Sequence, residues 1–91
     1  MDRIKLFVKI EQDPFYCLSK YIHWLCINAP MNYLKIDRYN FNSCFLETYY
    51  NENVLEYFYE MIRELNSTNC EFKLIRYNNT FEENLYSTED Q

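Results

Sequence analysis

The residue types that carry out catalysis or bind metals are few in this 91-residue chain and lie far apart. The chain has one histidine, His23, and no cysteine pair with the two-residue spacing typical of zinc sites. His23 has no acidic or nucleophilic neighbour that could make it a general base, and the absence of glycine excludes phosphate-binding loops and dinucleotide fingerprints. We therefore expect a protein that is not an enzyme, with no catalytic residue, no metal site, no cofactor and no small-molecule substrate.

The cysteines also indicate where the protein works. They are scattered along the chain, at Cys17, Cys26, Cys44 and Cys70. The chain has no apolar run of about 18 residues, which a membrane-spanning helix needs, and no recognisable secretory leader. We expect reduced, mostly buried thiols in a soluble, cytoplasmic protein that does not contact membranes.

Hydrophobic periodicity predicts the elements that position the remaining polar side chains. Apolar and polar residues alternate in four stretches, which indicates half-buried strands at 3–11, 33–39, 44–50 and 70–77. Apolar residues recur at helical spacing in two stretches, which indicates helices at 14–28, after the start signal Asp13-Pro14, and at 53–66.

This order, β-α-β-β-α-β, predicts an α+β fold with a single four-stranded sheet, two helices on one face and the other face open. Residues 1–77 are expected to form one domain, and the polar residues 78–91 an acidic C-terminal tail. The core is expected to contain Leu6, Val8, Leu18, Ile22, Leu34, Ile36, Leu55, Phe58, Ile62, Phe72 and Leu74.

Cations and aromatic rings gather on the predicted open face. The net charge is −5, but seven of the nine cations fall on predicted strands. Strand alternation aims ten cationic or aromatic residues at this face: Lys5, Phe7, Lys9, Tyr33, Lys35, Tyr39, Phe45, Tyr49, Lys73 and Tyr77. Arg38 and Arg76 have the opposite parity, so we place them at strand ends. Such a face can bind nucleic acid through phosphates and bases, although the same residues also suit cross-strand pairing and the protection of an edge strand.

Four glutamates at a spacing of four residues line one side of the second predicted helix: Glu52, Glu56, Glu60 and Glu64. This stripe is either a solvated helix face or a docking surface for a basic partner. The second possibility makes an acidic protein-interaction module, or a host-directed inhibitor, an alternative function.

The first strand resembles that of RNA-recognition-motif domains. Leu6–Glu11 is similar to their apolar-aromatic-apolar motif, and the element order and length also fit. The third strand departs from the family, because Asn42–Leu46 lacks the basic-Gly-aromatic motif and offers only Phe45 in a stacking position. A free RNA-binding domain of this type is a second alternative.

A resemblance that extends over nearly the whole chain is to the eukaryote-specific family of large-subunit ribosomal protein twenty-two. Lys5–Val8 resembles the lysine-led first strand of that family, and Leu34–Arg38 resembles its apolar-x-Ile-acid-Arg strand. Three further segments resemble, in order, its second helix, its last strand and its exit into an acidic tail: Val54–Phe58 with Leu65-Asn66, Glu71–Arg76 and Asn79–Glu82.

The resemblance implies a structural constituent of the ribosome that contacts rRNA and neighbouring ribosomal proteins. The family's second helix is rich in lysine, whereas this chain carries Glu56, Glu60 and Glu64 at those positions, so it would be a divergent, acidic member. RNA contact would then depend mainly on strand and strand-end cations. The expected RNA-binding residues are Lys5, Lys9, Lys35, Arg38, Arg63, Lys73 and Arg76.

Overall fold

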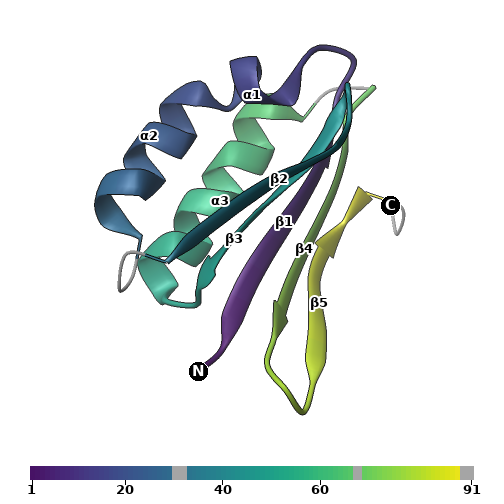
Figure 1. Ribbon diagram of the computed structural model, residues 1–91. Coiled ribbons are helices and arrows are strands. Elements are labelled where there is room, and N and C mark those ends of the chain that lie inside the picture. Colours follow the sequence, from purple (N-terminus) through teal and green to yellow (C-terminus); the bar gives the residue numbers. More distant parts are fainter. Residues whose placement is uncertain (30–32, 67–68, 89–91) are drawn as a thin grey trace.

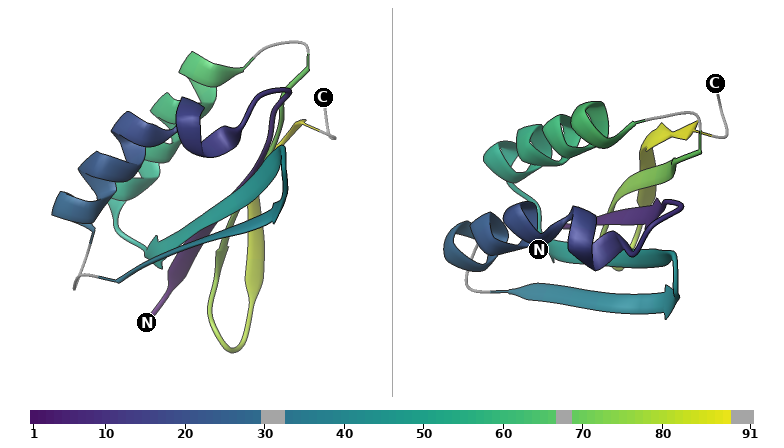
Figure 2. Two further views of the ribbon diagram at one scale, coloured as in Figure 1. Left: turned by 45° about the horizontal axis from the view of Figure 1, so that its top comes forward. Right: turned by 90° about the horizontal axis from the view of Figure 1, so that it is seen from above.

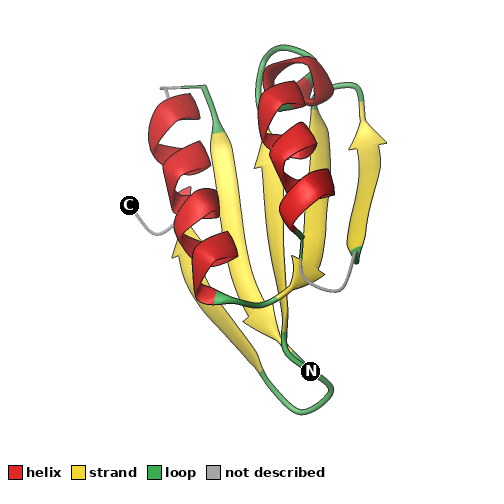
Figure 3. Ribbon diagram, turned by 90° about the vertical axis from the view of Figure 1, so that its left-hand side faces the viewer, coloured by secondary structure: helices red, strands yellow, loops and turns green. Residues whose placement is uncertain are grey.

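The computed structural model describes residues 1–29, 33–66 and 69–88. Within them, five strands form one antiparallel sheet in the spatial order β2-β3-β1-β4-β5, and three helices cover one face (Figures 1 and 3). In chain order the elements are β1 (Arg3–Lys9), α1 (Pro14–Cys17), α2 (Ser19–Asn28), β2 (Leu34–Asn40), β3 (Ser43–Tyr49), α3 (Glu52–Leu65), β4 (Glu71–Tyr77) and β5 (Glu82–Ser87).

The expected four-stranded sheet with two helices in the order β-α-β-β-α-β is therefore wrong. The fifth strand, β5, comes from the segment 78–91 that was expected to be a tail. Asn78 forms the turn that leads into it, because its side-chain oxygen accepts hydrogen bonds from the backbone N–H groups of Thr80 (2.8 Å) and Phe81 (3.2 Å). The returning chain then pairs with the edge of β4, with an irregularity between Leu74 and Ile75.

The first expected helix, 14–28, is divided into α1 and α2. The Asp13 carboxylate caps α1 by accepting the N–H of Phe15 at 3.0 Å, and Pro14 occupies the first helical turn. Leu18 then adopts φ −96° and ψ 1°, which interrupts the helix for one residue. Hydrophobic spacing does not reveal this break, because Leu18 and Leu25 keep a helical spacing of seven residues and both are buried.

The second expected helix forms as α3. Its N-cap is Asn51, whose side-chain oxygen accepts the N–H of Val54 at 2.9 Å, so the helix begins one residue earlier than expected. α3 has 14 residues and is the longest helix of the described chain; neither it nor α1 or α2 combines the length and apolarity needed to cross a lipid bilayer.

Figure 2 shows the helices stacked against one face of the sheet. The buried side chains of this face and of the helices form the core. Leu46, Leu6 and Leu74 form a row across the three central strands, and all three are fully buried. Four residues of the expected core are only half-buried: Ile22, Leu34, Ile36 and Leu55. Leu34 and Ile36 keep part of their surface in solvent because they lie on the edge strand β2. Besides Leu46, the core also contains residues that were not expected there: Ile4, Ile10, Tyr21, Leu25, Cys44, Val54 and Met61.

Candidate functional site on the open sheet face

The face of the sheet away from the helices gathers cationic and aromatic side chains from several strands. β1 contributes Arg3, Lys5, Phe7 and Lys9, the residues that alternate with its buried apolar side chains. In the register of the sheet, β3 and β4 bring Phe45 and Lys73 alongside Phe7, and Glu47 and Ile75 alongside Lys5. β2 adds Lys35, opposite Glu47, and Asp37, opposite Phe45.

Three rings form an aromatic patch on this face, made of Phe7, Tyr39 and Phe45. The rings of Phe7 and Tyr39 are nearly parallel, with centroids 6.0 Å apart, and Phe45 lies 6.2 Å from Phe7 and 5.4 Å from Tyr39. The Lys5 ammonium is 4.1 Å from the centre of the Phe45 ring, and that of Lys35 is 5.8 Å from the same ring. Two lysine ammonium groups thus lie at cation–π distance from the patch.

The three rings differ in what they can offer to a ligand. Phe45 is only 5% exposed, because its neighbours cover it, so the stacking role suggested by its position in the sequence is not available to it. Phe7 is half-buried, and Tyr39 is 56% exposed. Phe7 and Tyr39 therefore present the accessible aromatic surface of the patch.

An open hollow of about 240 Å³ adjoins the aromatic patch. Phe7 and Tyr39 line it on one side and Lys73 on another, and the hydroxyl-bearing Ser43 and Thr88 also border it. Its lining also includes Lys9 and the Glu71 carboxylate, which form an ion pair. The rings, lysines and hydroxyl groups are side chains that can bind an unstacked base and its phosphate, whereas Glu71 opposes a phosphate next to it.

The other half of the face is organised around a buried carboxylate. Glu47 is 5% exposed and accepts hydrogen bonds from the phenol groups of Tyr33 and Tyr77. Burial alone would raise the pKa of the Glu47 carboxyl, but these two hydrogen bonds and the charges of Lys5 and Arg3 outweigh it and hold the pKa below its usual value. Burial and the bond to Glu47 raise the pKa of Tyr77 to about 12.

Arg3 completes this cluster. Its guanidinium carbon lies 5.9 Å from the centre of the Tyr33 ring, and a hydrogen bond with Tyr77 is the main cause that raises the pKa of Arg3. Its buried Nε has no hydrogen-bond partner among the described residues. Sequence reasoning did not include Arg3 or Glu47 in the site. The alternation of the strands does place both residues on the open face. Their contacts could not be predicted, because they depend on how the strands are aligned with one another.

The expected RNA-binding residues are only partly brought together. Lys5, Lys35 and Lys73 surround the aromatic patch, whereas Lys9 lies at the end of β1 and pairs with Glu71 at 3.5 Å. That pair is well exposed on both sides, so it is a weak and easily exchanged contact.

The three arginines of the expected site lie elsewhere. Arg38 binds Asp13 at 3.1 Å on the helix side of β2, and its guanidinium carbon is 4.3 Å from the centre of the Phe15 ring. Arg76 binds Asp2 at 2.6 Å, at the opposite end of the sheet. Arg63 lies in the last turn of α3, in the helical layer. None of the three adjoins the aromatic patch.

The glutamate stripe of α3 divides into two parts. Glu64 binds Lys20 of α2 at 2.7 Å and accepts the phenol hydrogen bond of the buried Tyr21, so it links the two helices. These hydrogen bonds from Lys20 and Tyr21 lower the pKa of the Glu64 carboxyl. The other members of the stripe, Glu52, Glu56 and Glu60, are exposed.

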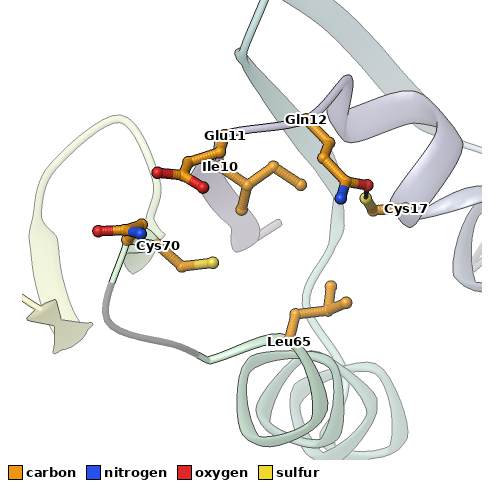
Figure 4. Close-up of a pocket in the computed structure, with 7 residues that line it drawn as sticks. Ile10, Glu11, Gln12, Cys17, Leu65 and Cys70 are labelled. Carbon is orange, nitrogen blue, oxygen red and sulfur yellow. Dashed lines mark hydrogen bonds between the residues drawn. The ribbon is translucent and has the colours of Figure 1, made fainter.

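A second hollow, of about 190 Å³, lies where the β1–α1 connection meets the end of α3 (Figure 4). Cys17 of α1 and Cys70, which directly precedes β4, both line it, and Cys17 donates a long hydrogen bond to Gln12 (3.6 Å). All four cysteines are free, and within residues 1–29, 33–66 and 69–88 no cluster of three potential metal ligands occurs.

Comparison with protein-family models, with curated proteins and with solved structures gives no match for this chain.

Proposed function

We propose that this chain is an RNA-binding structural protein of the large ribosomal subunit, and that it contacts rRNA through the open face of its sheet. The proposal rests first on the resemblance of the sequence segments to the ribosomal family. The structural observation that carries it is the group of three lysines, Lys5, Lys35 and Lys73, beside the aromatic patch. The protein would work in the cytoplasm and would have no catalytic activity.

The distribution of charge supports RNA contact on this face despite the acidic total. The outward residues of β1 to β4 include five cations: Arg3, Lys5, Lys9, Lys35 and Lys73. They include three carboxylates, Asp37, Glu47 and Glu71, and β5 adds a fourth to this face, Glu82, which lies opposite Tyr77. Glu47 is buried beneath two phenols, so it is shielded from a ligand on the surface. The chain as a whole carries −5, so its excess acidity lies elsewhere, notably on α3.

The chemistry of the patch favours unstacked nucleotides over a regular duplex. Lysine ammonium groups bind phosphate without regard to sequence, and exposed rings stack on bases of any kind. Phe7 and Tyr39 offer such rings beside Lys73, which lies opposite Phe7 on β4. The expected role is therefore to position and stabilise a loop or bulge of rRNA and not to select a sequence.

The test compares charge-neutralised variants on the two faces of the molecule. Lys35→Gln and Lys73→Gln each remove one cation from the open face, and Arg63→Gln is the matched control because it removes one cation from the helical layer. Binding to purified large subunits and to a bulged RNA hairpin is measured at several salt concentrations. Each open-face variant should lower the slope of log K against log salt by about 0.7 to 1 unit, while Arg63→Gln should leave it unchanged.

Two outcomes would overturn the proposal. One is binding that is insensitive to Lys35→Gln, Lys73→Gln and Tyr39→Ala together. The other is binding that is lost in Glu56→Gln and Glu60→Gln and kept in the lysine variants, because that pattern would assign the interaction to the acidic helix and to a basic partner.

A further inference from the structure

The strand β2 has a self-complementary outer edge. β2 is the first strand in the spatial order of the sheet, so one side of it pairs with β3 and no described strand pairs with the other (Figure 3, where β2 is the strand joined to α2 by the grey trace). An edge strand presents unpaired backbone N–H and C=O groups, which can form a ladder with another extended chain.

The charges on β2 indicate that a suitable partner for this edge is a second copy of the same strand. If two copies of β2 pair in antiparallel orientation about Ile36, then Lys35 of each copy lies opposite Asp37 of the other. Both side chains point to the open face, because they pair with Glu47 and Phe45 of β3. Opposite charges directly across two strands stabilise the pairing, and the two-fold axis produces this ion pair twice.

Both members of the ion pair are available for it. Lys35 and Asp37 are exposed. One oxygen of Asp37 accepts the N–H of Arg38 at 2.8 Å, and the second carboxylate oxygen can accept an ammonium group at the same time. On the helix side of the strand, Leu34 and Ile36 are only half-buried, so pairing about Ile36 would bring the two Ile36 side chains together and remove more apolar surface from water.

The other edge of the sheet lacks this property. β5 carries Glu82 and Glu83 and no cation, so two copies of β5 cannot form reciprocal ion pairs. A two-fold contact through β2 also closes on itself and leads to a dimer, not to a fibre.

We infer that two copies of this chain associate through β2, centred on Ile36, to form a continuous ten-stranded antiparallel sheet with reciprocal Lys35–Asp37 ion pairs. This inference does not depend on RNA binding. The paired segment is short, so the association is weak and is expected at the micromolar to millimolar concentrations typical of small interfaces.

The test uses charge exchange within β2 and sedimentation equilibrium of the full chain at low salt, up to about 1 mM protein. Lys35→Asp and Asp37→Lys each place like charges opposite each other in both pairs, so each should weaken dimerisation about tenfold. The double variant, Lys35→Asp with Asp37→Lys, restores opposite charges and should dimerise like the unmodified protein. Glu60→Lys, a charge reversal on the exposed face of α3, is the control and should have no effect beyond that of net charge.

Mixing the two single variants gives the sharpest outcome. Each variant repels itself, but the mixture places opposite charges across both pairs, so a heterodimer should form at concentrations about tenfold lower than either variant alone requires. A protein that is monomeric at all concentrations, or single variants that dimerise as well as the double variant, would refute the inference. Circular dichroism of each variant checks that a loss of association is not a loss of the fold.

Discussion

At the scale of single residues, Glu47 holds the most constrained charge of the open face. It is buried, it lies opposite Lys5 and Lys35 in the register, and it accepts phenol hydrogen bonds from Tyr33 and Tyr77. These contacts favour the ionised form strongly enough to hold the Glu47 pKa below 4.5, its value in an unfolded chain. A group with a depressed folded pKa stabilises the fold above its unfolded pKa and loses that contribution as pH falls through the folded pKa.

Glu47→Gln should therefore change stability in a pH-dependent way. At pH 7 the variant should unfold with a free energy lower by about 1 to 3 kcal/mol, because it loses charge-assisted hydrogen bonds at a buried position. Below pH 4.5 the unmodified protein should lose this advantage, and the two urea unfolding curves should converge. Glu60→Gln, at an exposed position, is the control. A constant difference between Glu47→Gln and the unmodified protein from pH 7 to pH 3 would contradict the assignment.

At the scale of elements, α3 is held on the sheet by one buried face. Phe58 lies in the middle of that face and is fully buried, beside Val54, Met61 and Ile62 of the same helix. Phe58→Ala should lower the free energy of unfolding by about 3 to 5 kcal/mol, since it removes a large side chain and leaves a cavity. That loss would approach the whole stability of a small domain.

Chemical denaturation followed by circular dichroism measures this effect. Ile27→Ala is the matched control, because Ile27 is also on a helix but is 67% exposed, and its truncation should change the free energy by less than about 0.5 kcal/mol. Equal stability of the two variants would mean that α3 does not pack as described.

The elements that could be predicted from the sequence are those whose signal is local. Alternation identified β1 to β4, although in β3 and β4 it is incomplete because the apolar Phe45 and Ile75 lie on the open face. The same alternation placed Lys5, Phe7 and Lys73 on one face. The Asp13-Pro14 signal located the beginning of α1, because capping depends on adjacent residues alone.

The elements that were missed depend on distant parts of the chain. β5 has the sequence Glu-Glu-Asn-Leu-Tyr-Ser, which lacks alternation, and it forms a strand because β4 offers a free edge and Tyr59 of α3 donates a hydrogen bond to the carbonyl of Leu85 (3.4 Å). Arg38 and Arg76 could be placed at strand ends, but their partners Asp13 and Asp2 follow from the tertiary fold. The spacing of residues in the sequence therefore could not show that both arginines form ion pairs within the protein.

At the scale of the whole molecule, the reactivity of the Cys44 thiol measures whether the sheet and the helices unfold together. It is fully buried on β3, and burial raises the pKa of its thiol to about 11, so very little reactive thiolate exists near neutral pH. Cys26 lies on the exposed side of α2. A pulse of alkylating reagent at pH 8 should modify Cys26 rapidly and Cys44 only at the rate of global unfolding, as measured by peptide mass spectrometry.

The urea dependence provides the check on this prediction. Labelling of Cys44 should accelerate with urea in parallel with the unfolding rate, while labelling of Cys26 should hardly change. Modification of Cys44 as fast as Cys26 in the absence of urea would mean that β3 opens independently of the rest of the sheet.

The position of β1 at the centre of the sheet affects how the protein can fold while it is being made. β1 pairs with β3 on one side and with β4 on the other, and the residues opposite Leu6 are Leu46 and Leu74. During synthesis from the N-terminus, β1 is therefore made long before either neighbour, and it has no strand partner on either side until β3 has emerged. Such long-range pairing slows folding and exposes apolar strands on the nascent chain. We therefore expect the central part of the sheet to form only after β3 and β4 have both been made.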